Sequence, residues 1–198
     1  MAQNGDDFFS DDRVELALDQ LLTCLESHQE TILGIADPDP ALITSYNDLI
    51  ERMKKAKGSL FYPYLSSGLG RGCYVKCADG SVKLDFISGI GAHWAHSDVG
   101  LTRQVLKAAL CDTVMQGNLQ QHNRSLLLYE RLVRLSGMDV AFLTSSGVMG
   151  VENALKLCFH HRPLSSRVLS FSKNFCGRTL AASSITDKPG NRQGLPIV

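Results

Sequence analysis

Residues 140–158 read VAFLTSSGVMGVENALKLC, and this stretch decides the fold class. The apolar run Val140–Leu143 is typical of a strand that is buried on both faces. A turn of small residues, Ser145-Ser146-Gly147, follows at once, and residues 148–158 have the periodicity of a helix. A second apolar run, Arg167–Phe171, predicts another strand. Strand, helix and strand in this order predict a right-handed βαβ unit, and therefore an α/β fold with a mainly parallel sheet.

The chain upstream of this unit begins with helical patterns. Apolar residues recur at helical spacing after Ser10, which is suited to cap a helix, and the pattern stops at Gly34. A second helical pattern follows the break at Asp37-Pro38-Asp39-Pro40 and ends in three lysines before Gly58. We therefore expect residues 1–60 to form an N-terminal helical segment.

Residues 61–98 predict a small β-meander. The stretches Cys73–Lys76 and Val82–Ile87 alternate as strands do, and Ala78–Ser81 is typical of a hairpin turn. The second strand leads into a Gly-rich loop, Ser88–Asp98. The glycine-rich stretch Ser66–Gly72 precedes a predicted strand, so it lacks the strand–loop–helix order that a nucleotide-binding glycine motif requires.

Residues 99–198 form the third predicted segment. Asp98 is suited to cap a helix, and another helix is predicted over Asn123–Ser136 because Gly137 provides a stop. With the βαβ unit, these helices predict a truncated α/β domain, since two buried strands leave sheet edges and apolar faces uncovered.

Composition excludes several classes of protein. Of 198 residues, 44% are hydrophobic and 20% are charged, which is typical of a globular protein. Lysine plus arginine equals aspartate plus glutamate, so no net field would attract nucleic acid or an anionic membrane. The polar, acidic start Met1–Asp12 does not resemble a secretion signal, and no apolar run reaches the roughly 20 residues of a membrane span. We expect a cytoplasmic protein with reduced cysteines.

One group of residues raises the alternative of a metal site. Cys73 and Cys77 lie four residues apart on a predicted strand, and His93 and His96 follow in the loop. Their spacing matches none of the usual paired zinc ligands, and small buried cysteines are the commoner explanation. The prediction is that no metal is bound.

The turn Ser146-Gly147-Val148 is the first candidate site. It follows a predicted parallel strand and opens a helix, where free backbone N–H groups and the helix dipole attract an anion. A hydrolase nucleophile at Ser146 would need glycine two residues earlier, where Thr144 stands. A helix cap without any ligand stays an open alternative.

The second candidate stretch follows the second predicted strand and reads Phe175-Cys176-Gly177-Arg178-Thr179. An aromatic face can stack on a planar heterocycle, and the guanidinium of Arg178 can hold a carboxylate or phosphate. A turn that binds phosphate, a ring that stacks and a guanidinium that binds a carboxylate are together suited to a phosphorylated pyridine cofactor that acts on amino acids.

Three motifs give the chain a resemblance to a known family. The stretch Leu84–Ile90, followed by a His-containing loop and a helix, resembles the corresponding segment of class III aminotransferases of the acetylornithine and ornithine type. Ser146-Gly147 with Glu152, Ala154, Leu155 and Lys156 is similar to their phosphate-binding turn and helix. Phe175 with Gly177, Arg178 and Thr179 matches their aromatic-His-Gly-Arg-Thr motif. The likeness runs from about Gly68 to the C-terminus.

The resemblance implies a fold-type I transaminase dependent on pyridoxal 5'-phosphate. Residues 61–98 would include the loop at the active site, and residues 99–198 would be the N-terminal part of the cofactor-binding large domain. The turn of Ser146, Gly147 and Val148 would bind the phosphate, Phe175 would stack on the ring with Cys176 beside it, and Arg178 would hold a substrate carboxylate. The implied partners are an amino donor, a 2-oxo acid acceptor and a second subunit in a homodimer, with no nucleic acid and no membrane.

The sequence also departs from the family. Val148 and Met149 stand where the family has a hydroxyl residue and glutamate, and Cys176 replaces a histidine. Family members continue well beyond this length and supply an aspartate for the pyridine nitrogen and a lysine for the Schiff base, neither of which has a counterpart here. We therefore expect the chain alone to be inactive and a partner chain or further segment to supply the missing part. The alternatives are a non-catalytic remnant or pairing subunit that binds the cofactor weakly or not at all, and an α/β domain without a small ligand.

Overall fold

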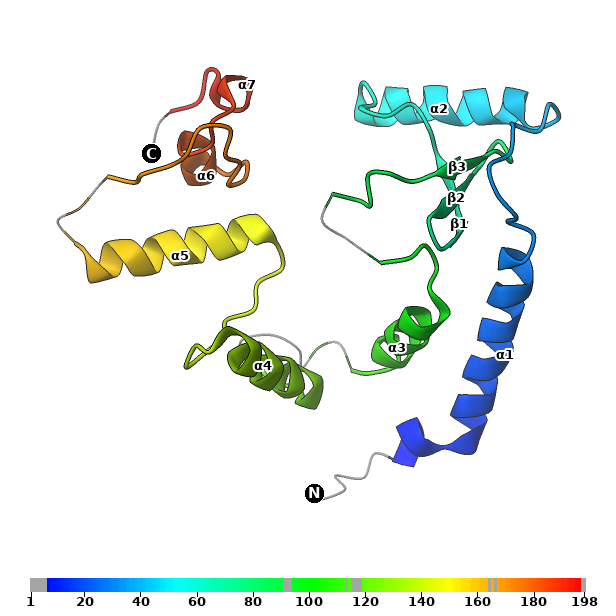
Figure 1. The fold of residues 1–198 in the computed structure, drawn as a ribbon, viewed down its shortest axis with the longest axis horizontal. Coiled ribbons are helices and arrows are strands. Elements are labelled where there is room, and N and C mark those ends of the chain that lie inside the picture. The colour runs from blue at the N-terminus through cyan, green and yellow to red at the C-terminus, as the bar shows by residue number, and fades with distance from the viewer. Residues whose placement is uncertain are drawn as a thin grey trace. The chain divides into compact units, whose positions relative to one another are not determined.

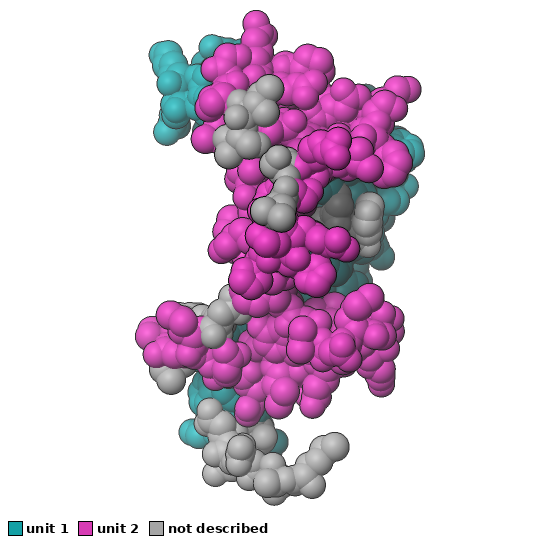
Figure 2. Space-filling model, turned by 90° about the vertical axis from the view of Figure 1, so that its left-hand side faces the viewer, with its two compact units in different colours: residues 1–113 teal, residues 114–198 magenta. Residues whose placement is uncertain are grey.

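The computed structural model describes residues 7–90, 94–112, 114, 119–163, 165 and 167–196. The chain divides into two compact units, Met1–Thr113 and Val114–Val198, which Figure 2 shows in different colours. The predicted division into three segments at residues 60 and 98 stays a prediction. No helix in the described parts of the chain combines the length and the apolar character that crossing a bilayer requires.

Unit 1 begins with helices (Figure 1). A short 3-10 helix, η1 (Asp7–Ser10), precedes α1 (Asp12–Gln29). Asp11 caps α1 by accepting the N–H of Arg13 at 2.8 Å, so the cap lies one residue after the predicted Ser10. Helix α2 (Ile43–Lys57) ends at Gly58, as predicted.

The sheet of unit 1 is an antiparallel meander in the order β1-β2-β3. Its strands are β1 (Ser66–Arg71), β2 (Tyr74–Cys77) and β3 (Val82–Leu84). The turn between β2 and β3 is held by Asp79, whose Oδ1 accepts the N–H of Ser81 at 2.9 Å and its hydroxyl at 2.6 Å. The predicted meander is confirmed, and β1 adds a strand that the glycine-rich sequence did not indicate.

Helix α3 (Val99–Ala109) is capped by Asp98, as predicted, and packs against α1. The guanidinium of Arg103 donates to the carboxylate of Glu15 at 2.8 Å, and Lys107 also binds Glu15. Arg103 bridges to Asp19 as well. This group of charges joins two helices that are far apart in the sequence.

The amide of Gln29 at the end of α1 makes a second connection inside unit 1. Gln29 is buried, and its Nε2 donates to the carbonyl oxygens of Gly70 at 2.7 Å and Ser97 at 2.8 Å. A buried amide that satisfies two loop or strand carbonyls fixes their separation, because leaving either oxygen unpaired would be costly.

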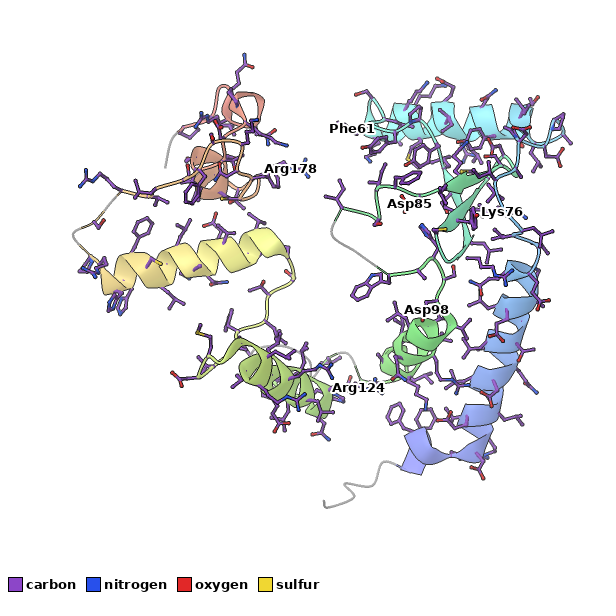
Figure 3. The ribbon with its side chains drawn as sticks, viewed as in Figure 1. Phe61, Lys76, Asp85, Asp98, Arg124 and Arg178 are labelled. Atoms are coloured by element: carbon purple, nitrogen blue, oxygen red, sulfur yellow. The ribbon has the colours of Figure 1, made fainter. Side chains whose placement is uncertain are left out.

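Asp85 fixes the two ends of the loop that precedes α3. Its Oδ1 accepts the N–H groups of Ile87 at 2.7 Å and Ser88 at 3.1 Å, and its Oδ2 lies 2.8 Å from Nε2 of His96. Figure 3 labels Asp85 and Asp98 on this part of the chain. The pKa of Asp85 lies below its ordinary value, chiefly because the N–H groups of Ile87 and Ser88 stabilise the carboxylate, with a smaller effect from His96.

The Asp85→Asn variant is expected to unfold unit 1 at a lower temperature near neutral pH. A carboxyl group with a lowered folded pKa stabilises the fold above its unfolded pKa of about 4, and this contribution disappears as the pH falls through the folded value. The difference from the unmodified protein should therefore shrink below about pH 4. Thermal unfolding followed by Trp94 fluorescence between about pH 3 and pH 7 measures it, with exposed Asp48→Asn as control. An equal difference at every pH would contradict the prediction.

Unit 2 contains the remaining helices. Helix α4 (Asn123–Ser136) has the predicted bounds and ends at Gly137, whose φ of 69° is left-handed. Helix α5 (Gly147–His161) follows the predicted turn, and the short helices α6 (Leu180–Ser184) and α7 (Pro189–Arg192) complete the unit.

The prediction of two buried parallel strands in unit 2 is wrong for this structure. Neither Val140–Leu143 nor Arg167–Phe171 forms a strand, and the sheet in the described residues is antiparallel. A strand exists only when a neighbour supplies backbone partners, and no described segment pairs with either stretch as a strand. Most of their apolar side chains are exposed, with Leu169 97% and Phe171 87% accessible, whereas Ala141 and Leu143 are half-buried.

Candidate functional site

A cavity of about 580 Å³ in unit 2 brings the two predicted motifs together. Its volume lies in the range typical of small-molecule sites. It is lined by three residues of α5 and by a five-residue loop, namely Gly147, Val148, Val151 and Phe175 to Thr179. Five of the six predicted site residues therefore border one space, and Ser146 does not.

The start of α5 offers two unused hydrogen-bond donors. Ser146 is the N-cap, and its Oγ accepts the N–H of Met149 at 3.4 Å. The N–H of Gly150 donates to the carbonyl oxygen of Ser146 at 3.1 Å. The N–H groups of Gly147 and Val148 have no acceptor among the described residues. Both are available to an anion in the cavity, where the dipole of a 15-residue helix adds attraction.

Gly177 lets the loop approach α5 closely. Its φ is +136°, and a Cβ placed on it would lie 2.2 Å from Cγ2 of Val148. The same Cβ would lie 3.2 Å from Cβ of Ala182 in α6. No other residue type fits this position without displacing α5 or α6. The glycine therefore sets the separation between the start of α5 and the loop on which Phe175 and Arg178 lie.

Thr186 connects the loop to α6 by hydrogen bonds. It is fully buried, and its Oγ1 accepts the N–H of Cys176 at 3.0 Å and donates to the carbonyl oxygen of Ala182 at 2.8 Å. Asn174 adds a bond from Nδ2 to the carbonyl oxygen of Ile185 at 2.8 Å. Because these bonds hold the side chain of Asn174 and the backbone of Cys176, on the two sides of Phe175, the loop is positioned before any ligand arrives.

An accessible ring and an unpaired cation complete the site. Phe175 is 55% accessible, and Nζ of Lys188 lies 5.3 Å from its ring centroid. Figure 3 labels Arg178 on the loop next to α6. Arg178 is exposed and forms no ion pair or hydrogen bond with the other residues that the structure describes. A cavity with a ring, a guanidinium and two N–H donors can bind a planar anion.

Four participants in this site, Gly177 among them, were not among the six predicted site residues, although Glu152, Gly177 and Thr179 belong to the motifs of the family resemblance. Val151 and Thr179 line the cavity, and Glu152 contacts Thr179. The helical period carried a signal for two of them, because Val148, Val151 and Glu152 are three and four residues apart and so share one face of α5. The contact of Glu152 with Thr179 spans 27 residues of sequence, and no local pattern indicates it.

Unit 1 has cavities of its own near Asp85 and His96. One of about 600 Å³ is lined mainly by aromatic and aliphatic side chains, including Tyr62 and Tyr64, and one of about 390 Å³ includes Trp94. The alternative of a metal site concerned Cys73, Cys77, His93 and His96. Cys73 is exposed, Cys77 is buried, and His93 lies outside the described residues. No group of three or more His, Cys, Asp and Glu residues suited to a metal occurs in the described ranges.

Comparisons with known proteins agree on one family. A family profile described as "Aminotransferase class-III" matches residues 60–197. Over 121 residues the chain is 36% identical to the acetylornithine aminotransferase of Archaeoglobus fulgidus, a match that covers 60% of this chain and 32% of that relative. The chain therefore spans about a third of the length of this relative.

Solved structures show a similar fold. A Bacillus anthracis aminotransferase superposes with a TM-score of 0.66 at 21% identity, over 78% of this chain and 37% of the other. The omega transaminase of Pseudomonas jessenii in complex with PMP superposes with a TM-score of 0.59 at 20% identity, over 76% of this chain and 37% of the other. At these identities the likeness concerns the fold alone.

Proposed function

Because the chain belongs to the class III aminotransferases, we propose that unit 2 binds pyridoxal 5'-phosphate in the cavity between α5 and the loop of residues 175–179. This family uses that cofactor. One observation carries the proposal. Two unpaired N–H groups, an accessible aromatic ring and an unpaired guanidinium all border the same cavity.

Each residue has a distinct role in the proposed complex. The N–H groups of Gly147 and Val148 bind the phosphate, since an anion at a helix start satisfies donors that the helix cannot use. Phe175 stacks on the pyridine ring and keeps water from one face of it. Arg178 holds a substrate carboxylate through its planar pair of donors. Cys176 borders the cavity through a backbone that Thr186 fixes.

The proposed activity of the complete protein is amino transfer from an amino acid or related amine to a 2-oxo acid. The bound cofactor supplies an electron-accepting ring, and the residues of this chain bind and orient it. Since the chain spans about a third of the length of its relatives, a further segment or a partner chain supplies the other groups that the reaction needs. Pairing of two subunits is part of this proposal.

Exposed apolar residues support the presence of such a partner. Val140 and Phe142 are 82% and 63% accessible, and they lie on an extended stretch that forms no strand. Leu169 and Phe171 repeat this arrangement on the second stretch. Exposed apolar side chains on segments outside any strand are features that a neighbouring strand can cover.

A non-catalytic role is the second candidate. Val148 stands where family members place a hydroxyl, so the phosphate would lose one hydrogen bond that its charge strengthens. Such a bond contributes about 1.5 to 3 kcal/mol, which corresponds to a loss of affinity of roughly tenfold to a hundredfold. A chain that binds the cofactor weakly would act as a pairing subunit of a complete relative.

Binding of pyridoxamine phosphate (PMP) tests the proposed site. PMP has the ring and phosphate of the cofactor but no aldehyde, so it cannot react with surface lysines. We expect saturable binding of one PMP per chain in calorimetric titration, and we expect inorganic phosphate to compete because both anions use the start of α5. Absence of saturable binding, or binding that phosphate does not reduce, would rule out the cavity as the cofactor site.

A further inference from the structure

Glu152 connects α5 to the loop of the proposed cofactor site. The hydroxyl of Thr179 donates to the carboxylate Oε1 of Glu152, and both residues are partly buried. Thr179 also caps α6, because its Oγ1 accepts the N–H of Ala182 at 3.3 Å. Glu152 itself is absent from the residues that line the cavity, so any effect on a ligand must pass through Thr179.

This hydrogen bond joins α5 to the loop, and a second contact does the same. The second is the close contact of Gly177 with Val148. The two contacts lie on either side of Arg178, and the residues that they join on α5 are one helical turn apart. Together they fix both the distance and the tilt of the loop relative to the start of α5.

A phosphorylated pyridine needs both elements at once, because its phosphate lies on α5 and its ring lies on the loop. We infer that Glu152 is a positioning residue for the cofactor, which holds Phe175 and Arg178 through Thr179 at the spacing that the ring and phosphate require. This inference rests on the proposed function. An acceptor that is charged gives a stronger hydrogen bond than a neutral one, which suits a carboxylate to this task.

Two ligands that each carry a phosphate group should respond differently to changes at Glu152. Inorganic phosphate needs only the N–H groups of Gly147 and Val148, which α5 supplies alone. PMP needs the loop as well. We therefore expect Glu152→Ala to weaken PMP binding about tenfold while inorganic phosphate binding changes less than about twofold. Glu152→Gln keeps an acceptor and should restore PMP affinity to within about threefold of the unmodified protein.

Calorimetric titration of both ligands with the full chain is the measurement, and thermal unfolding of each variant accompanies it. Asn153→Ala is the matched control, because Asn153 lies on the same helix and its Nδ2 donates to the carbonyl oxygen of Met149 at 2.9 Å, away from the loop. Thr179→Val removes the hydroxyl that donates to Glu152. It should also weaken PMP binding and leave inorganic phosphate binding nearly unchanged, so the inference can still be tested if Glu152→Ala does not fold.

The outcomes are distinguishable. If the unmodified chain fails to bind PMP, the proposed function is wrong. If it binds PMP and folded Glu152→Ala or Thr179→Val binds it equally well, the role of Glu152 is wrong. Equal weakening of PMP and inorganic phosphate would also overturn the inference, because it would mean that Glu152 only stabilises α5.

Discussion

Replacing Gly177 by alanine is expected to abolish measurable PMP binding and to destabilise unit 2. The φ of +136° is one that side chains other than glycine rarely adopt, and such strain costs about 1 to 3 kcal/mol. The new Cβ would also lie 2.2 Å from Cγ2 of Val148, and overpacking of this kind costs about 1 to 3 kcal/mol. The loop must move away from α5, which separates the ring from the phosphate-binding N–H groups.

Thermal unfolding and PMP titration measure this effect, and two variants make it specific. Gly190→Ala is the control, because a Cβ on Gly190 meets no atom within 4 Å. The double variant Val148→Ala with Gly177→Ala should recover part of the lost stability, since it relieves the contact with Cγ2 but neither the 2.8 Å approach to Cβ of residue 148 nor the backbone strain. A Gly177→Ala protein that unfolds and binds PMP like the unmodified chain would show that the loop does not need this close approach.

Replacing Gly147 by proline is expected to weaken both PMP and inorganic phosphate by roughly tenfold to a hundredfold, because it removes one of two N–H groups that bind the anion. Proline is well suited to the first residue of a helix, where its missing N–H costs the helix nothing. Ser146 before it is extended, with φ of −158° and ψ of 157°, as a residue preceding proline prefers. The fold should therefore survive.

Gly147→Ala provides the comparison, because it keeps the N–H and its Cβ meets no atom within 4 Å. Titration of both phosphates against the two variants separates loss of a donor from loss of space. Equal affinities of the proline and alanine variants would place the anion away from the start of α5. The pattern also differs from that of Glu152→Ala, which should affect PMP and spare inorganic phosphate.

Local signals in the sequence predicted several helix ends, although α1 ends at Gln29 and not at the predicted Gly34. Helix α4 has the predicted bounds Asn123–Ser136, because a left-handed glycine at position 137 is a strong and purely local stop. Asp98 was identified as the cap of α3 because capping is also a local signal, in which the side chain accepts the N–H of Leu101, three residues later. The turn between β2 and β3 was also predicted, since its residues hydrogen-bond within a few positions of one another.

Strands were harder to predict because their existence depends on distant partners. Val140–Leu143 and Arg167–Phe171 have the composition of buried strands, yet they lack a strand partner among the described residues and remain exposed. The reverse holds for β1, whose sequence Ser66–Arg71 is rich in small residues and became a strand because β2 lies beside it. Composition reports the preference of a segment, whereas pairing decides its structure.

The candidate site was predictable where each residue acts through its own backbone or ring. Gly147, Val148 and Phe175 followed from turn and strand positions, and they line one cavity. Ser146 was expected in the site, but its hydroxyl is used to cap α5. The tie from Glu152 to Thr179 depends on how α5 and the loop pack, which only the three-dimensional structure shows.

The amide of Gln29 has a consequence for where this protein can be cut. The family profile begins at residue 60, so α1 and α2 lie outside it, and yet Gln29 supplies the donors for Gly70 and Ser97 within it. A chain shortened to start at residue 60 would leave both oxygens without these donors and would remove the apolar cover formed by Leu18 and Leu22. Helix α1 therefore covers part of the interior of unit 1, and removing residues 1–59 to obtain a smaller fragment would expose it.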